Sequence, residues 1–128
     1  MKLFTPSILA LALGSSLLHA ETDKAQVWDV NAPQGQFETV DIKVSKGSWM
    51  NIALSPDGKT LAFDLLGDIY TMPVTGGTAT LLTKDIGWQM QPAFSPDGQY
   101  IAYTSDEGGG DNIWIMRADG SEPRAVTN

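Results

Sequence analysis

The chain has 128 residues, of which 42% are hydrophobic and 18% are charged, a balance typical of one globular domain. Asp and Glu number 15 against 8 Lys and Arg, which gives a net charge of −7. A surface of this sign repels phosphate backbones and anionic lipid. We therefore expect neither nucleic acid nor a membrane surface as a partner.

Residues 1–20 have the pattern of a secretory signal peptide. Lys2 precedes a mostly apolar run that ends at Ala20, and polar residues begin at Glu21. This predicts cleavage after Ala20 and a periplasmic or secreted protein. A transmembrane anchor would need about 20 predominantly apolar residues, and here Pro6 and Gly14-Ser-Ser break the run. The chain has no cysteine, so despite export its fold must rest on packing without disulfides.

Residues 21–48 are predicted to be an N-terminal extension with one strand. From Phe37 to Val44 the chain alternates, with Val40 and Ile42 on the same face as Val44. An alternation with a period of two is typical of a β-strand.

A ten-residue segment then occurs twice, at residues 54–63 and 94–103, and each copy contains Ser-Pro-Asp-Gly. Proline presets φ at the second turn position, aspartate can bond nearby backbone, and glycine accepts a conformation that other residues resist. The flanking residues are rich in strand formers. Each copy is therefore predicted to be a hairpin, with strands over 51–54 and 60–63, and over 91–94 and 100–103.

The similarity continues beyond the hairpins. Residues 68–77 align with 112–121, and 80–83 with 124–127, with four extra residues between Thr104 and Ile113. A period of about 40 residues with four short strands is typical of a β-propeller blade. The sequence therefore predicts an all-β fold, a partial β-propeller over residues 49–128, with four-stranded antiparallel blades at 49–83 and 89–127. The strand near residue 40 could close the ring on its last blade or lie at the edge of the first blade.

The third strand of each blade carries bulky residues. Because they recur at the same blade position, we expect them to pack between blades, and we also treat Trp49 and Trp88 as packing residues. The residues of the third strands are Ile69, Tyr70 and Met72 in the first blade and Ile113, Trp114 and Met116 in the second.

Antiparallel strands alternate in direction, which assigns the loops to two rims. The Ser-Pro-Asp-Gly turns and residues 118–121 are expected on one rim. Residues 64–68, 84–89 and the longer loop 105–111 are expected on the other.

These repeats resemble the propeller repeat of the TolB family, shared with tricorn-like and prolyl-oligopeptidase-like peptidases. The residues that carry the resemblance lie at 94–103 and 112–121, and it covers residues 49–128. Four shorter stretches resemble the N-terminus of large secreted amidohydrolases that carry such a propeller ahead of the catalytic domain. They are Trp28-Asp-Val, Phe37-Glu-Thr-Val, residues 63–70 and residues 109–114.

The residue types restrict the chemistry. His19, the only histidine, lies in the predicted signal peptide, and there is no cysteine. The remaining chain can therefore build neither a Ser-His-Asp or Cys-His apparatus nor a zinc site with nitrogen and sulfur ligands. Ser55 and Ser95 are interpreted as turn residues and not as nucleophiles.

The carboxylates are the remaining candidates. Asp106, Glu107 and Asp111 surround three glycines and could ligate calcium, but their spacing matches no complete calcium loop. Asp64 and Asp68 could form a carboxylate pair, although no pocket can be assigned to them. We expect no catalytic, cofactor-binding or metal site in this segment.

Two blades leave two apolar sheet faces uncovered, whereas propellers close with about four to eight blades. We therefore expect the chain to be the N-terminal fragment of a longer protein. A ring assembled from several chains is the alternative.

The amidohydrolase resemblance implies an exported hydrolase whose downstream barrel holds a divalent metal, with the propeller serving substrate access or protein interaction. Its partners would be downstream domains of the same chain and protein or peptide ligands at the propeller face. The fragment itself would not be an enzyme. The alternatives are a non-catalytic TolB-like interaction propeller and the propeller of an exported serine peptidase.

Overall fold

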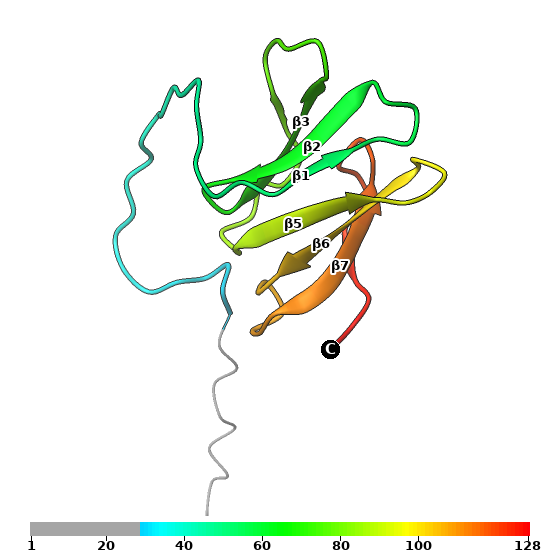
Figure 1. Ribbon diagram of the computed structural model, residues 1–128. Helices are drawn as coiled ribbons and strands as arrows, with labels where there is room; N and C mark the ends of the chain where they lie inside the picture. Colours follow the sequence, from blue (N-terminus) through cyan, green and yellow to red (C-terminus); the bar gives the residue numbers. More distant parts are fainter. Residues whose placement is uncertain (1–28) are drawn as a thin grey trace, which may run out of the picture.

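The computed structural model describes residues 29–128, so the predicted signal peptide and Trp28 lie outside the described residues. The described chain forms two antiparallel four-stranded sheets, in the order β1-β2-β3-β4 and β5-β6-β7-β8, which confirms the all-β, two-blade prediction (Figure 1). The strands are β1 Ile52–Leu54, β2 Thr60–Leu65, β3 Asp68–Pro73, β4 Thr80–Leu81, β5 Gln89–Phe94, β6 Tyr100–Ser105, β7 Asn112–Arg117 and β8 Arg124–Ala125.

Each sheet is a meander in which every strand pairs with the next along the chain. The central hairpins are long and regular: β2 pairs with β3 from Thr60↔Pro73 to Leu65↔Asp68, and β6 with β7 from Tyr100↔Arg117 to Ser105↔Asn112. The fourth strands are short, with two residues each. The two sheets thus repeat one plan.

The strand β5 is longer and less regular than predicted. It begins at Gln89 rather than at Gln91, and its register with β6 shifts between Met90 and Ala93. Gln91 takes a positive φ of 58°. Such an irregularity bends a strand and increases its twist. In Figure 1 this strand runs beside β1 and β2 of the first sheet.

The core lies between the sheets. Ala62 and Ile69 of the first sheet are fully buried against residues of the second. Each fully buried Ile or Met side chain contributes roughly 1.5–3 kcal/mol. The cluster comprises Ala62, Ile69, Ile101, Tyr103 and Met116, with Leu82, Phe94 and Trp114 packed against it.

The prediction for the third strands needs a correction, because neighbouring residues of a strand face opposite sides. From β3 only Ile69 joins the core cluster, and from β7 only Trp114 and Met116 do so. Ile113 is 46% exposed. Trp49 and Trp88 are also exposed, at 99% and 53%, so neither is a buried packing residue.

The strand predicted over residues 37–44 is not formed. The segment has no strand assignment, and the side chains of Phe37, Val40, Ile42 and Val44 are all more than half exposed. A strand needs a neighbour to satisfy its backbone groups, and both sheets contain only strands from residue 52 onward. In Figure 1 this segment leaves the sheets as a wide cyan loop.

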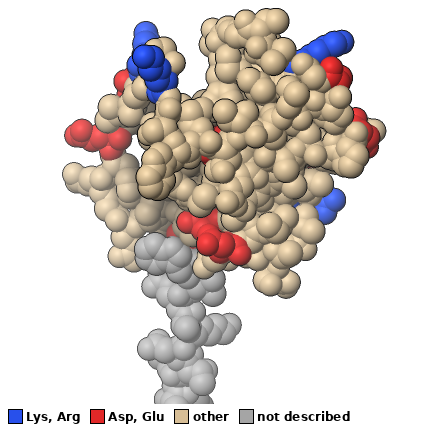
Figure 2. All heavy atoms as spheres, viewed as in Figure 1, with Lys and Arg blue, Asp and Glu red and all other residues tan. Residues whose placement is uncertain are grey.

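Charged side chains lie mostly around the periphery of the face shown in Figure 2, and the centre of that face is largely uncharged. Among residues 29–128, no helix is long and apolar enough to span a membrane.

Candidate functional site

The two Ser-Pro-Asp-Gly turns have the same hydrogen bonds. Ser55 Oγ donates to Asp57 Oδ1 at 2.6 Å and accepts the N–H of Thr60 at 2.9 Å, and Ser95 repeats both distances with Asp97 and Tyr100. Each hydroxyl therefore donates one hydrogen bond and accepts another within its own turn. This supports the interpretation of the two serines as turn residues.

The aspartates of these turns are held in their ionised form. The Ser55 hydroxyl and the N–H of Lys59 both donate to Asp57, and they hold its pKa below the ordinary value. The Ser95 hydroxyl and the N–H of Gln99 do the same for Asp97. Hydrogen bonds to a carboxylate favour the charged form.

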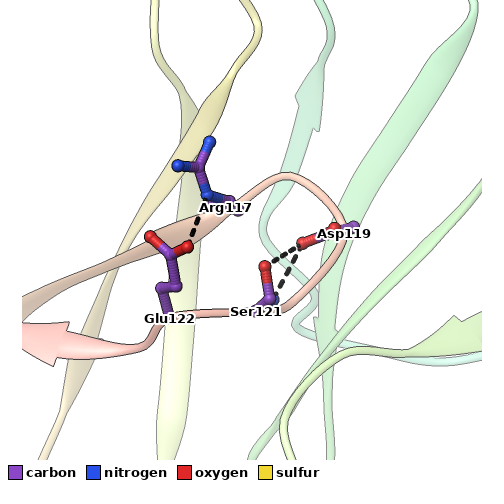
Figure 3. A network of polar contacts seen from close by, with 4 residues as sticks. All are labelled: Arg117, Asp119, Ser121 and Glu122. Atoms are coloured by element: carbon purple, nitrogen blue, oxygen red, sulfur yellow. Dashed lines mark hydrogen bonds and ion pairs between the residues drawn. The ribbon is translucent and has the colours of Figure 1, made fainter.

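The third turn of this rim, between β7 and β8, uses similar chemistry (Figure 3). Asp119 Oδ1 accepts both the N–H of Ser121 at 2.9 Å and its hydroxyl at 2.6 Å. Beside it, Arg117 Nε pairs with Glu122 Oε1 at 3.1 Å. These polar groups are therefore hydrogen-bonded or ion-paired with one another within the turn.

A shallow hollow of about 530 Å³ separates the turns. Its lining confirms that the two Ser-Pro-Asp-Gly turns and the start of residues 118–121 share one rim. The lining residues are Ser55, Pro56, Asp57, Thr60, Phe94, Asp97, Gly98 and Ala118.

The opposite rim is built differently, from apolar side chains that remain exposed. Leu66, in the tight turn between β2 and β3, takes a φ of 56° and is 65% exposed. Positive φ is rare for a residue other than glycine, and strained residues cluster at functional sites. Ile86 and Trp88, from the connection between the sheets, are 60% and 53% exposed.

Contacts between the sheets hold this apolar group in place. The N–H of Gln89 donates to Gly67 O at 2.7 Å. The Trp88 ring lies so close to Gly67 that a Cβ there would be 2.8 Å from it. The connection between the sheets is thus held against the β2–β3 turn by a hydrogen bond and by close packing.

Carboxylates surround the same loops. Asp106 Oδ1 accepts the N–H of Trp88 at 2.7 Å. Asn31 joins the N-terminal extension to this rim, because it accepts the N–H of Ile86 at 3.0 Å and donates to Glu107 at 3.2 Å. We call Leu66, Asp85, Ile86, Trp88, Asp106 and Glu107 the acidic rim.

The electrostatics of the acidic rim disfavour additional negative charge. Burial and the neighbouring Asp85 raise the pKa of the Glu107 carboxyl. Burial likewise raises the pKa of Asp68, and Asp85 adds to the effect. A positively charged group placed at this rim would meet carboxylates whose mutual repulsion it relieves.

The other predicted carboxylates do not converge on a site. Within residues 29–128 no three acidic or histidine side chains are arranged to hold a metal ion. Asp64 and Asp68 occupy opposite faces of β2–β3, since Asp64 lies opposite Ile69 and Asp68 opposite Leu65. The carboxylate pair considered from the sequence is therefore not formed.

Asp64 and Asp68 instead bind backbone and hydroxyl groups. Asp64 accepts the backbone N–H groups of Asn51 and Gln91. Asp68 accepts the Thr83 hydroxyl at 3.3 Å, and the same hydroxyl accepts the N–H of Ile69. Their roles are structural.

The acidic rim was not predicted from the sequence as a mixed surface. The sequence assigns the loops 64–68, 84–89 and 105–111 to one rim, but it predicts Trp88 to be a packing residue. The acidic loop 105–111 was considered only as a calcium ligand set, and no metal site was expected there. The available signal was Leu66-Gly67 between two strands, a two-residue connection typical of a tight hairpin with positive φ.

Comparison with known proteins agrees with this architecture. Residues 17–128 match the family model of the TolB beta propeller domain. The chain is 35% identical to a solved protein from Agrobacterium tumefaciens assigned as TolB, with a TM-score of 0.59 over 66% of this chain and 32% of the other.

Two further relatives are known from their sequences. One is the uncharacterized protein Atu1656 of Agrobacterium fabrum, 38% identical over 78 residues, which are 58% of this chain and 27% of the relative. The other is dipeptidyl-peptidase 5 of Porphyromonas endodontalis, 37% identical over 80 residues, which are 52% of this chain and 12% of the relative. The chain thus spans about a quarter, or less, of the length of these relatives. By its repeats, its two sheets and the match over residues 17–128, the chain belongs to the TolB beta propeller domain family.

Proposed function

We propose that this chain is a non-catalytic propeller segment of an exported hydrolase of the amidohydrolase type, and that it serves substrate access or protein interaction through its loops. The acidic rim is the observation that carries the interaction role. There, strained Leu66 and exposed Ile86 and Trp88 lie among carboxylates. An exposed apolar group with a charged border is typical of a binding surface.

The chemistry of the rim indicates the kind of ligand. Trp88 and Ile86 offer apolar contact, and Asp85, Asp106 and Glu107 offer negative charge. A peptide or protein segment with a basic residue beside an apolar one fits both features. Catalysis is assigned to another part of the whole protein, where a divalent metal would activate water.

A second candidate, the propeller of an exported serine peptidase, is favoured by the similarity to dipeptidyl-peptidase 5. The two candidates share the role of the rim and differ in the catalytic domain. A third, a TolB-like interaction propeller without any catalytic domain, is supported by the structural similarity to the Agrobacterium tumefaciens protein.

The experiment assays the full gene product and the 128-residue chain against amide, ester and peptide substrates. We expect activity in the full product that a chelator removes, and none in the shorter chain. Chelator-resistant activity that a serine-directed reagent abolishes would transfer the assignment to the peptidase. A full product that hydrolyses none of these substrates would favour the interaction propeller.

A further inference from the structure

Every Asp-Gly pair of the chain lies in a turn of the same rim. The sequence contains three such pairs and no Asn-Gly pair. An aspartate followed by glycine is the peptide context most prone to isomerisation, because glycine has no side chain to hinder attack by its backbone nitrogen on the aspartate carboxyl group. The pairs lie in the β1–β2, β5–β6 and β7–β8 turns and are Asp57-Gly58, Asp97-Gly98 and Asp119-Gly120.

The reaction requires two groups of the turn to be free. The glycine nitrogen attacks the side-chain carbonyl carbon of the aspartate, a C–N bond forms, and the carboxyl OH leaves as water together with the amide hydrogen. Water then opens the succinimide ring at either carbonyl, which restores aspartate or gives isoaspartate. The carboxyl group must be protonated for its OH to leave, and the glycine nitrogen must be free to approach it.

The glycine nitrogen of each pair is already held by a hydrogen bond. In all three turns its N–H donates to the backbone carbonyl three residues earlier. The three bonds are Gly58 to Ser55 O at 2.9 Å, Gly98 to Ser95 O at 2.9 Å and Gly120 to Arg117 O at 2.8 Å. Attack on the aspartate would have to break this bond, which also closes the turn.

The carboxylate of each pair is held by a serine of its own turn. The serine lies two positions before the aspartate in the Ser-Pro-Asp-Gly turns and two positions after it in the third turn (Figure 3), yet its hydroxyl donates to the carboxylate at 2.6 Å each time. A backbone N–H is the second donor. The hydroxyl and this N–H hold the pKa of all three carboxyl groups below the ordinary value, so the protonated form that can lose OH is rare.

The turns cannot avoid the reactive pair by exchanging the glycine. All three glycines have a φ between 71° and 87°, which is unfavourable for a residue with a Cβ. The aspartate is needed as well, because its carboxylate accepts the N–H of the residue two positions later. The hydrogen bond from the serine is therefore the means that these turns have of keeping the pair unreactive.

We propose that Asp57, Asp97 and Asp119 are latent isoaspartate sites, and that the serine hydroxyl of each turn keeps them from isomerising in the folded chain. Isoaspartate would add one carbon atom to the backbone of the turn and would move the carboxylate away from its donors. The three turns would then lose the geometry that forms their rim. This inference does not depend on the proposed hydrolase role, because every group in the reaction belongs to the turns themselves.

The test compares the three sites within one molecule. The natural full-length protein is incubated in mildly acidic buffer, either folded or unfolded in guanidinium chloride. Isoaspartate is then located by electron-transfer fragmentation of tryptic peptides. Cleavage after Lys and Arg places each Asp-Gly pair in a peptide of its own, residues 47–59, 85–117 and 118–124. We expect isoaspartate at all three sites in the unfolded chain and several-fold less at each of them in the folded protein.

Two substitutions decide the role of the hydroxyl. In the folded Ser95→Ala protein, Asp97 should isomerise several-fold faster, whereas Asp57 of the same molecule keeps its natural rate. Ser95→Thr retains a hydroxyl and should leave Asp97 unreactive. Ser55→Ala is the reciprocal variant, in which Asp57 should react and Asp97 should not.

Three results would overturn the proposal. The first is folded natural protein that isomerises at these sites as fast as the unfolded chain. The second is a Ser95→Ala protein in which Asp97 stays as slow as in the natural protein or becomes faster together with Asp57, since the hydroxyl would then have no effect of its own. The third is equally fast isomerisation of Asp97 in the Ser95→Ala and Ser95→Thr proteins.

Discussion

The carboxylate of Asp64, on β2 of the first sheet, accepts the backbone N–H of Gln91, on β5 of the second sheet, at 2.7 Å. The same carboxylate accepts the N–H and the side-chain amide of Asn51 at 2.9 and 2.7 Å. Gln91 is the residue with positive φ at the irregularity of β5. Asp64 therefore holds the bent strand against the first sheet through a carboxyl group that is almost completely buried.

Replacing Asp64 should weaken the contact between the sheets. Asp64→Ala removes the acceptor of three N–H groups, and we expect the free energy of unfolding to fall by about 2–4 kcal/mol. Asp64→Asn keeps one acceptor oxygen and should lose less. Chemical denaturation measures both, with exposed Asp111→Ala as the control. A loss equal to that of the control would contradict the role of this carboxylate.

Two glycines with similar φ values allow the cost of backbone strain to be measured separately from the cost of a steric contact. Gly58 has a φ of 73°, and a Cβ added to it would meet no atom within 4 Å, whereas a Cβ on Gly120, at φ 87°, would lie 3.1 Å from Leu82 O of the other sheet. Gly58→Ala should cost only backbone strain, about 1–2 kcal/mol. Gly120→Ala should cost about 1–3 kcal/mol more, because the backbone at Leu82 must move. Equal midpoints of thermal unfolding would show that this turn does not contact Leu82.

Gln89 is 1% exposed, and neither polar atom of its amide has a hydrogen-bond partner among the described residues. Burying an unpaired amide is unfavourable, and an apolar side chain of the same shape avoids this cost. We therefore expect Gln89→Met to raise the free energy of unfolding by about 1 kcal/mol. The control is Gln99→Met at an exposed turn position, where we expect a change within about 0.5 kcal/mol. A less stable Gln89→Met protein would show that the amide is paired in solution.

The repeated architecture was predictable because local chemistry determines it. Pro56 with Asp57, and Pro96 with Asp97, fix the first turn of each sheet, and alternating apolar residues fix the strands on either side. The strand over 37–44 was not predictable in the same way. Its alternation shows only that it could be a strand, whereas forming one requires a partner edge that neither described sheet provides.

The sites depend on contacts between residues that are far apart in the sequence, and the sequence alone does not show which of them meet. Asp64 and Gln91 are brought together by the packing of two sheets. The irregularity of β5 has no glycine at Gln91, and the available signal was Pro92, because a proline within a strand is typical of an edge or a bulge. The apolar part of the acidic rim was also missed, because Trp88 resembles a core residue until its exposure is known. The charged loops, by contrast, were correctly placed on one rim.

Export remains a prediction, since residues 1–28 lie outside the described part of the chain. The positive Lys2 and the apolar run up to Ala20 predict removal of residues 1–20. Mass spectrometry of the protein recovered from the periplasm should find an N-terminus near Glu21. Recovery of intact Met1 from that fraction would rule out the cleavage.

The turn aspartates should make stability depend on pH in the acid range. Hydrogen bonds from Ser55 and Ser95 lower the pKa values of Asp57 and Asp97 in the folded chain, while an unfolded aspartate titrates near its ordinary value of about 3.9. A group whose pKa is lower in the folded state stabilises fully above its unfolded pKa. This stabilisation is lost as the pH falls through the folded pKa.

Other carboxyl groups have the opposite effect on the pH dependence of stability. The free energy of unfolding of the natural protein, measured against pH, therefore does not by itself test the role of Asp57 and Asp97. The pKa values of Asp68 and Glu107 are raised in the folded state, and their contribution weakens as the pH rises from acid values. The informative quantity is therefore the difference between the natural protein and Asp97→Asn, whose neutral amide can still accept from Ser95 and Gln99. We expect the natural protein to be more stable near pH ~6, above the ordinary pKa of aspartate, and the difference to shrink as the pH falls through the lowered pKa of Asp97. Ser95→Ala removes the largest cause of the lowered pKa and should weaken the pH dependence similarly, whereas a difference that stays constant with pH would show that Asp97 titrates normally.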